Sequence, residues 1–359
     1  MNKNTRIQEG RHSLITSSFA FLPGVLPILL FLSLLPAFLT LCTRGELPTD
    51  PEEELSAATG LEETGTQIIL KSEAAASCLD VFFFNNDSLA RLDSYQRIEA
   101  ESPSGVDASS RNGSKILVVL ANSSSDKYTW ADVNSYDMLR TTMFELSGED
   151  PETPVMSAEC TIEETGAEDC SLVLEPLMSI VELGGISCDF SGRAYEGCEL
   201  ENVVVYLSNV NERCAALPSG EGGIEAMVNL GGLNEGDLIS FLHPEMLLQT
   251  IDVPIGTEEI EAGLEFYCYP NTTEEDVAGS PYTRLVIEGT LDGETCYYPI
   301  NVNRSDGGNG IERGQRYILN VYITKRGSSD PDTPLEAGSA TITVSVSGWE
   351  EMDDITIGF

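Results

Sequence analysis

Short apolar runs separated by polar turns fill the chain from residue 66 onward. The runs are four to eight residues long and rich in Val, Ile, Thr, Tyr and Phe, and turns containing Asn, Asp, Gly or Pro separate them. Runs of this length and composition are typical of β-strands. We predict strands at 66–70, 78–84, 115–120, 171–174, 203–207, 264–269, 284–288, 316–323 and 341–346.

The last of these runs alternates as a strand with one buried face does. Ile342, Val344 and Val346 fall on one side of it, and threonine and serine fall on the other. Along the chain, strands follow strands without regularly interposed helices, which favours antiparallel sandwiches over βαβ units. The sequence therefore predicts an all-β fold with one or two short helices.

The order of the strand-like runs indicates two tandem units. We place the boundary near Leu172, where a new series of runs begins, so that the units cover 66–172 and 173–359. A short acidic echo supports this division, because Asp150-Pro-Glu-Thr-Pro154 resembles Asp330-Pro-Asp-Thr-Pro334. Both segments are expected to form rigid acidic turns.

One segment has helical rather than strand periodicity. Apolar side chains recur there at spacings of three and four residues, at Val133, Tyr136, Leu139, Met143 and Phe144. We therefore predict a helix over 130–146, with its apolar face packed on a sheet. Asp132 lies near its start, where a carboxylate suits the unpaired amide groups.

The first 41 residues contain the parts of an export signal. Three basic residues, Lys3, Arg6 and Arg11, precede 23 uncharged residues that end at Leu41. Cys42 follows directly, which favours a lipoprotein signal in which the Cys42 thiol is acylated and the chain is cut before it. Leu41 is larger than the residue usual at that position, so an ordinary signal peptide and a retained membrane anchor stay open. All three alternatives place the rest of the chain outside the cytoplasm.

The stretch 42–65 is acidic and has no apolar periodicity, so we predict a flexible spacer there. Over the whole chain, 59 acidic and 19 basic residues give a net charge of −40. A surface of that charge repels phosphate backbones, which excludes a nucleic-acid partner. The later apolar runs are too short for a second membrane span.

The search for chemical motifs returns little. His12 and His243 are the two histidines of the chain, which disfavours histidine-based zinc sites and Ser-His-Asp catalysis. The sequence contains no CxxC, P-loop, HExxH or GxSxG motif, and its acidic clusters do not match an EF-hand loop. We predict no catalytic residues, no metal and no cofactor.

Eight cysteines follow Cys42, an even number that permits disulfides. Cys160 and Cys170 are a candidate local pair, and Cys188 and Cys198 have the same spacing. Cys268 and Cys296 lie in two aromatic strand-like runs that are candidates for neighbours. The alternative is that several of these cysteines are buried free thiols that pack as small apolar side chains.

The segment 79–98, LDVFFFNNDSLARLDSYQRI, resembles the N-terminal domain of the fimbrillin family, the subunits of type V pili in Bacteroidales. Further motifs follow in the order of that family. They are 116–122 (ILVVLAN), 128–136 (YTWADVNSY), 154–157 (PVMS), 203–209 (VVVYLSN), 266–271 (FYCYPN), 297–301 (YYPIN), 316–321 (RYILNV), 328–334 and Trp349. The similarity covers roughly 66–350.

This resemblance implies two tandem transthyretin-like β-sandwich domains, lipoprotein export to the outer membrane and assembly by strand exchange. In that scheme a protease cuts after an arginine and removes the first strand of the N-terminal domain. The open groove then accepts a C-terminal strand of the neighbouring subunit. An unpaired sheet edge beside an empty apolar groove is completed by such β-addition.

Two features of this chain bear on that scheme. No arginine lies between Gly45 and Ala90, so Arg44 is the candidate processing site, although a cut there leaves the run 66–70 in place. At the other end, Ile355, Ile357 and Phe359 share one face of a candidate donor strand, which is alternatively the closing strand of its own domain.

We therefore predict a structural or adhesive fimbrial subunit at the cell surface, in an accessory, tip, anchor or shaft position. Its expected partners are other fimbrial subunits, the outer membrane through a lipid anchor, and a host or bacterial surface receptor. The alternative is a surface glycan-binding lipoprotein that does not polymerise, with Trp130 or Trp349 stacked on sugars. An extracellular hydrolase has no located site in the sequence.

Overall fold

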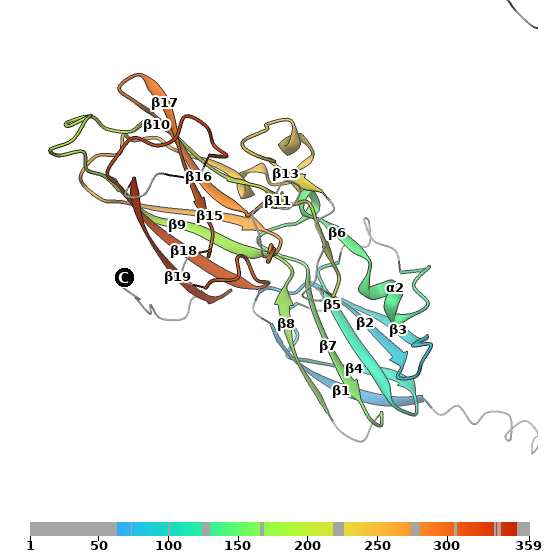
Figure 1. The fold of residues 1–359 in the computed structure, drawn as a ribbon. Coiled ribbons are helices and arrows are strands. Elements are labelled where there is room, and N and C mark those ends of the chain that lie inside the picture. The colour runs from blue at the N-terminus through green and yellow to red at the C-terminus, as the bar shows by residue number, and fades with distance from the viewer. Residues whose placement is uncertain are drawn as a thin grey trace, which may run out of the picture. The chain divides into compact units, whose positions relative to one another are not determined.

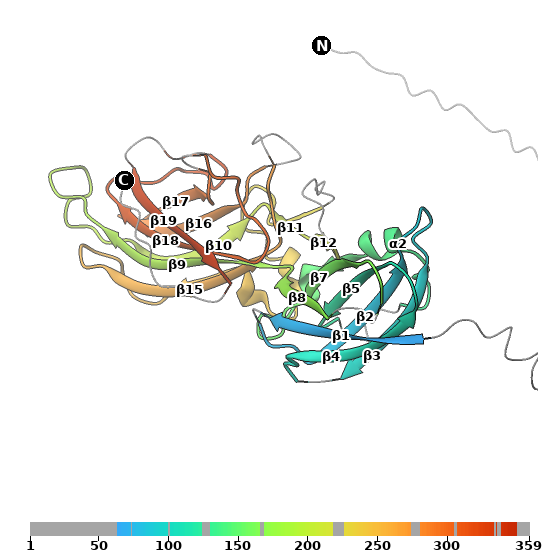
Figure 2. The same ribbon diagram turned by 90° about the horizontal axis from the view of Figure 1, so that it is seen from below.

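The computed structural model describes residues 63–72, 74–99, 101–123, 130–165, 169–217, 226–273, 281–304, 307–333, 335 and 339–349. These residues belong to one compact unit, and Figures 1 and 2 show its strands. Each of the nine predicted runs overlaps a strand, and the prediction of an all-β fold is confirmed.

Seven strands form a first sandwich. They are β1 (Glu63–Ser72), β2 (Cys78–Asn85), β3 (Leu92–Glu99), β4 (Gly105–Arg111), β5 (Lys115–Ala121), β7 (Met156–Ile162) and β8 (Cys170–Pro176). Their order across the sheet is β3-β2-β5-β7-β8-β1-β4. The sheet folds over on itself, because Ile68 of β1 and Leu172 of β8 share one buried cluster with Leu79 of β2 and Leu117 of β5.

Strand β2 is buried on both faces, and this explains why its sequence is a nearly continuous hydrophobic run. Leu79, Val81 and Phe83 point into the core of the first sandwich. Phe82 and Phe84 point to the opposite face, where they belong to a second buried cluster that extends into the rest of the chain. A strand covered on both faces does not need polar alternation.

Two four-stranded sheets form a second sandwich around the larger cluster. One sheet has the order β14-β10-β16-β17 and the other has the order β15-β9-β18-β19. The strands are β9 (Ser179–Cys188), β10 (Glu201–Ser208), β14 (Leu248–Ile251), β15 (Ile260–Cys268), β16 (Arg284–Leu291), β17 (Glu294–Asn301), β18 (Gln315–Ile323) and β19 (Ala340–Gly348). In β19, Ile342 and Val344 pack against the core as predicted, but Val346 is half exposed.

Short elements complete the described chain. Three short strands are β11 (Val210–Asn211), β12 (Arg213–Ala215) and β13 (Met227–Val228). Two 3-10 helices are η2 (Asp237–Ser240) and η3 (Pro244–Met246). The two acidic echoes both form turns, since the Asp150 carboxylate accepts from the amide of Glu152 and the Asp330 carboxylate accepts from the amide of Asp332.

The predicted helix over 130–146 is wrong except for one turn. Helix α2 spans only Tyr136–Arg140, with Ser135 as its N-cap, and the chain continues as β6 (Met143–Glu145) and the 3-10 helix η1 (Leu146–Gly148). The hydroxyl groups of Thr141 and Thr142 donate back to carbonyls of the preceding turn, and β6 then pairs with β12. The predicted packing of the apolar face is confirmed, because Leu139 and Phe144 are buried beside β2.

The chain passes from the first to the second sandwich through Leu177 and Met178, which are both completely buried. The boundary predicted near Leu172 falls inside β8, which continues to Pro176. The pairing of β6 with β12 joins the two halves a second time. None of the helices in the described part of the chain has the length and apolar composition that a membrane crossing needs.

Candidate functional site

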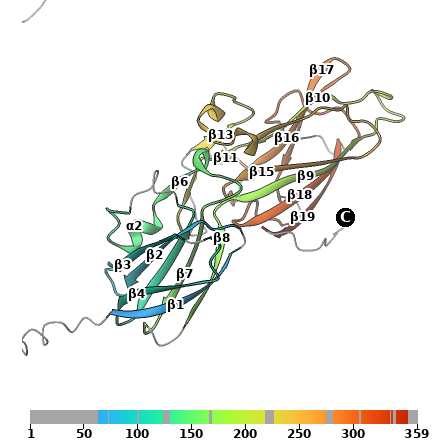
Figure 3. The same ribbon diagram turned by 180° about the vertical axis from the view of Figure 1, so that it is seen from behind.

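Strand β1 fills a slot between two other strands of the first sandwich. It pairs antiparallel with β4 over Glu63–Ile69 and parallel with β8 over Ile68–Ser72. Figure 3 shows β1 and β4 side by side along their length. We call this position, bounded by β4 and β8, the β1 slot.

One face of β1 completes the core of the first sandwich. The side chains of Thr66, Ile68 and Leu70 are buried, whereas those of Gln67 and Ile69 are exposed. Burying a side chain as large as Ile68 or Leu70 stabilises a fold by about 1.5–3 kcal/mol. A β1 slot without its strand is therefore an apolar groove with one unpaired edge on each side.

The β4 wall of the slot is held by side chains of β3. The Ser94 hydroxyl and the Gln96 amide both donate to the Ser109 carbonyl, at 2.6 and 2.7 Å. The Asp93 carboxylate accepts from the Arg111 amide at 2.8 Å. None of these bonds involves β1, so they do not depend on whether the slot is filled.

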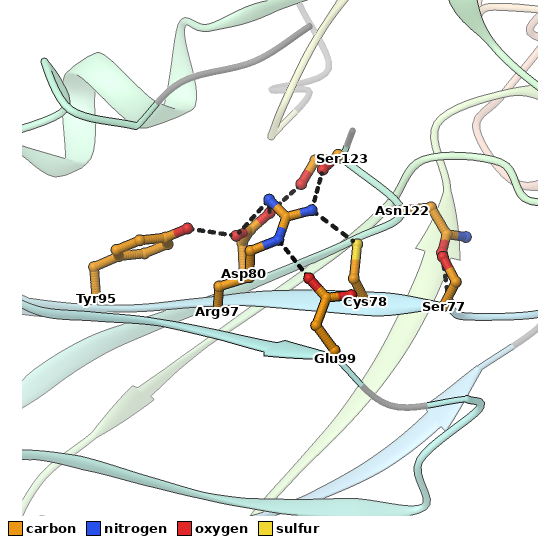
Figure 4. A network of polar contacts seen from close by, with 8 residues as sticks. All are labelled: Ser77, Cys78, Asp80, Tyr95, Arg97, Glu99, Asn122 and Ser123. Atoms are coloured by element: carbon orange, nitrogen blue, oxygen red, sulfur yellow. Dashed lines mark hydrogen bonds and ion pairs between the residues drawn. The ribbon is translucent and has the colours of Figure 1, made fainter. Parts of the chain in front are cut away.

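A buried carboxylate in turn fixes β3 to β2. Asp80 has no solvent exposure, and its carboxylate accepts from the Tyr95 hydroxyl at 2.7 Å, from the Ser123 hydroxyl and from the Arg97 guanidinium at 3.4 Å. Arg97 also donates to the Ser123 carbonyl and to Glu99. Figure 4 shows Tyr95 and Arg97 reaching Asp80 of β2 from β3, and Ser123 reaching it from the segment that follows β5.

This network is complete enough for a structural role. A buried carboxylate costs several kcal/mol unless donors satisfy it, and Asp80 has three. Burial, and then the hydrogen bond to Asp80, raise the pKa of Tyr95 to about 12, so its hydroxyl keeps its proton at neutral pH. Asp80 thus positions β3, the strand that holds the β4 wall.

The β8 wall is linked to β7 by a disulfide between Cys160 and Cys170. The other candidate pair, Cys268 and Cys296, is not joined, and this prediction is corrected. Cys268 lies in β15 and Cys296 in β17, which belong to different sheets, and both are buried free thiols. Cys188 and Cys198 are also free.

Several residues singled out in the sequence lie outside the described residues. They are Cys42, Arg44, Ile355, Ile357 and Phe359. Their roles in lipidation, processing and strand donation stay predictions. Lys71 is the one basic residue between Gly45 and Ala90, and it is exposed on β1.

The residues considered for other functions have structural surroundings. Trp130 and Trp349 are buried, the first against Phe82 and the second against Tyr267, so neither offers an open face to a sugar ring. His243 lies 3.0 Å from Glu245 at the start of η3. The part of the chain that the structure describes holds no group of three or more His, Cys, Asp or Glu residues that is placed to bind a metal.

Sequence reasoning missed β3, β4 and the Asp80 network. Both strands carry mixed polar side chains, which lack the apolar alternation of a half-buried strand. The one available signal was Asp80 itself, a charged residue inside the apolar run Leu79–Phe84. A charge at such a position needs donors from a neighbouring strand.

Neither a family model nor a curated protein matches this chain. Solved structures do. A candidate cell adhesion protein from Parabacteroides distasonis matches with a TM-score of 0.60 and 18% identity, over 79% of this chain and 96% of its own. A candidate cell adhesion protein from Bacteroides eggerthii matches with a TM-score of 0.60 and 17% identity, over 80% and 96%.

A fimbrilin from Porphyromonas gingivalis matches with a TM-score of 0.58 and 14% identity, over 79% of this chain and 97% of that one. At such identities the similarity concerns the fold, and in each case it covers nearly the whole of the other chain. The chain therefore has the fold of the fimbrillin-type proteins of Bacteroidales, as the resemblance in its sequence implies.

Proposed function

We propose that this protein is a fimbrial subunit of the cell surface that joins its neighbours by strand exchange at the β1 slot. One observation carries the proposal. β1 supplies buried side chains to the core, yet both walls of its slot have contacts that do not involve β1. A slot of this kind can lose one strand and accept another of similar pattern.

The fold supports the surface role. The solved proteins that share it are named for cell adhesion and as a fimbrilin. A net charge of −40 keeps such a protein soluble outside the cytoplasm and disfavours unspecific association with like-charged copies. Two such subunits therefore need a specific interface, made mainly of apolar contacts and backbone hydrogen bonds. An exchanged strand provides such an interface.

The partner strand in this proposal is the C-terminal segment of another subunit. Ile355, Ile357 and Phe359 give that segment the alternation of Ile68 and Leu70 in β1. Transfer through a lipid anchor at Cys42 and a later cut at Arg44 belong to the same proposal. A cut at Arg44 would leave β1 attached to the chain, because β1 begins only at Glu63. The proposal therefore includes an accessory, tip or anchor position in the fimbria as well as a shaft position.

A mixing experiment with purified chains tests the proposal. A recognition sequence for a specific protease is inserted after the exposed Ala75, between β1 and β2, in a chain that lacks Asp353–Phe359, and the cut chain is mixed with an intact chain. We expect head-to-tail complexes of two chains by size-exclusion chromatography with light scattering. Deletion of Asp353–Phe359 from the intact chain should abolish them.

The matched control is the same acceptor with the inserted sequence left uncut. In that chain β1 stays covalently attached and should outcompete the donor. Complexes that form equally well with the uncut acceptor, or with the donor lacking its tail, would contradict strand exchange at this slot.

A further inference from the structure

Strand β8 changes its ladder partner near its C-terminal end. Over Cys170–Leu174 it pairs with β1, and at Glu175 and Pro176 it pairs with β7. Among the described residues, no ladder joins β7 to the earlier part of β8. A cleft of about 330 Å³ opens there instead, with Ala158 and Cys160 on one side and Ser171 and Val173 on the other.

Two cross-links hold β8 at its opposite ends. At its beginning, Cys170 is bonded to Cys160 of β7. At its end, the guanidinium of Arg313 donates to the Pro176 carbonyl at 3.0 Å and to the Glu175 carbonyl at 2.5 Å. The same guanidinium donates to the carbonyl and the hydroxyl of Ser157 in β7, both at 2.9 Å.

These cross-links matter most when β1 is absent. The middle of β8 then has no ladder on either side, although Leu172 and Leu174 still face the core. A strand fixed only at Glu175 and Pro176 would move away from the slot, since a short unpaired strand gains backbone entropy on release. A strand fixed at both ends stays near its place.

We propose that the Cys160–Cys170 disulfide and Arg313 are positioning residues that keep β8 as a wall of the empty β1 slot, so that strand exchange requires the oxidised protein. This inference rests on the proposed function. If the Cys160–Cys170 disulfide is required, the β1 slot accepts a donor strand only in an oxidising compartment, where that bond persists.

The bond can be addressed selectively. Dithiothreitol reduces the disulfide to two thiols with the transfer of two electrons and two protons, and is itself oxidised to a cyclic disulfide. Every other described cysteine is already a free thiol. Burial raises the pKa of Cys188, Cys214 and Cys268 to about 12, so these three stay protonated and unreactive at neutral pH.

The test uses the full chain, cut after Ala75 and separated from its β1 fragment, and a fluorescent synthetic peptide with the sequence of residues 63–72. Fluorescence anisotropy measures binding of the peptide as it replaces β1. We expect binding at least tenfold weaker after reduction with dithiothreitol. A Cys160→Ser/Cys170→Ser double variant should bind as weakly as the reduced protein and show no response to dithiothreitol.

The uncut chain separates this role from general stabilisation. With β1 in place, the parallel ladder itself holds β8, so reduction should leave hydrogen exchange of the Leu172–Leu174 amides nearly unchanged. In the cut chain that lacks β1, reduction should speed their exchange strongly. Equal effects in both chains would mean a merely structural bond and would overturn the inference.

A matched control variant tests the cross-link that Arg313 makes at the C-terminal end of β8. Arg313→Gln should weaken peptide binding to the cut chain, whereas Arg193→Gln should not, because Arg193 is exposed and donates to the Thr324 carbonyl far from the slot. Equal binding by oxidised and reduced cut chains overturns the inference and leaves strand exchange standing. Failure of the oxidised cut chain to bind the peptide overturns strand exchange itself.

Discussion

The hydroxyl of Tyr95 lies 2.7 Å from a carboxylate oxygen of Asp80, and these two residues link the partly exposed strand β3 to the buried strand β2. This contact between Tyr95 and Asp80 also affects a strand beyond β3. β3 holds β4 through Ser94 and Gln96, and β4 is one wall of the β1 slot. A buried carboxylate on β2 thus contributes to the geometry of a groove two strands away.

Tyr95→Phe should lower the free energy of unfolding by about 1 kcal/mol at neutral pH, the usual net worth of one such hydrogen bond at a partly exposed position. The pKa of Tyr95 is raised from 10 to about 12 in the folded protein. Its contribution is therefore complete below pH 10 and is lost as the pH rises through 12, since the unfolded chain loses the proton first. Urea unfolding of both proteins between pH 7 and 12 measures this.

In that series the difference between the two proteins should be constant up to pH 10 and then shrink. Other tyrosines titrate in both proteins and cancel in the comparison. A difference that grows above pH 10 would show that the Tyr95 hydroxyl is not held in its protonated form by Asp80.

Neighbouring residues of β1 provide a direct test of which face completes the core. Ile68 is completely buried and Ile69 is 41% exposed. Ile68→Ala should cost about 2–5 kcal/mol of unfolding free energy, because it leaves a cavity, whereas Ile69→Ala should cost well under about 1 kcal/mol. Chemical denaturation of the two variants gives the comparison, and similar losses would argue against the pairing register of β1.

Part of this architecture could be predicted from the sequence. β2 and β5 are runs of apolar and β-branched residues whose burial is dictated by composition. β3 and β4 could not be recognised, because Ser94, Gln96 and Ser109 bond across the sandwich only after the strands are in place. The helix over 130–146 failed for a related reason, since β6 gains a partner, β12, that lies about 70 residues later.

The candidate site, too, could be predicted from the sequence only in part. Residues 66–70 of β1 are recognisable as a strand, and the short spacing of Cys160 and Cys170 marks a local pair. Spacing says nothing about Cys268 and Cys296, whose runs are similar in composition but belong to different sheets. The walls of the β1 slot depend on single hydrogen bonds from distant residues, and such bonds leave no periodic pattern in a sequence.

The buried pair of Tyr269 and Glu149 joins the second sandwich to the segment after η1. The Tyr269 hydroxyl donates to the Glu149 carboxylate at 2.8 Å, and both side chains are buried. Tyr269→Phe removes a donor from a buried carboxylate and should cost about 1.5–3 kcal/mol of unfolding free energy. Differential scanning calorimetry measures the loss.

Tyr322→Phe is the matched control for that variant. Its hydroxyl also donates to a carboxylate, that of Asp189 at 3.1 Å, but Tyr322 is 40% exposed. Water can replace this bond, so the loss of unfolding free energy should be much smaller than for Tyr269→Phe. An equal loss of unfolding free energy in Tyr322→Phe and Tyr269→Phe would mean that burial does not decide how much these hydrogen bonds stabilise the fold.

Arg313 joins the two sandwiches through four acceptor groups on β7 and β8, although it precedes β18 of the second sandwich. Arg313→Ala leaves the carbonyls of Ser157, Glu175 and Pro176 without this donor, and because the network is only partly buried we expect a loss of about 0.5–3 kcal/mol, the usual range for single substitutions. Lysine has one ammonium in place of a planar fork, so Arg313→Lys should recover only part of the loss.

Because the bonds of Arg313 cross from one sandwich to the other, the thermal transition of Arg313→Ala should also broaden or separate into two steps, as the sandwiches begin to unfold independently. Calorimetry detects this, and Arg193→Ala, which removes one exposed bond to the Thr324 carbonyl, should keep a single sharp transition. A single transition of unchanged width in Arg313→Ala would show that the buried apolar contacts around Leu177 and Met178 couple the two sandwiches without this arginine.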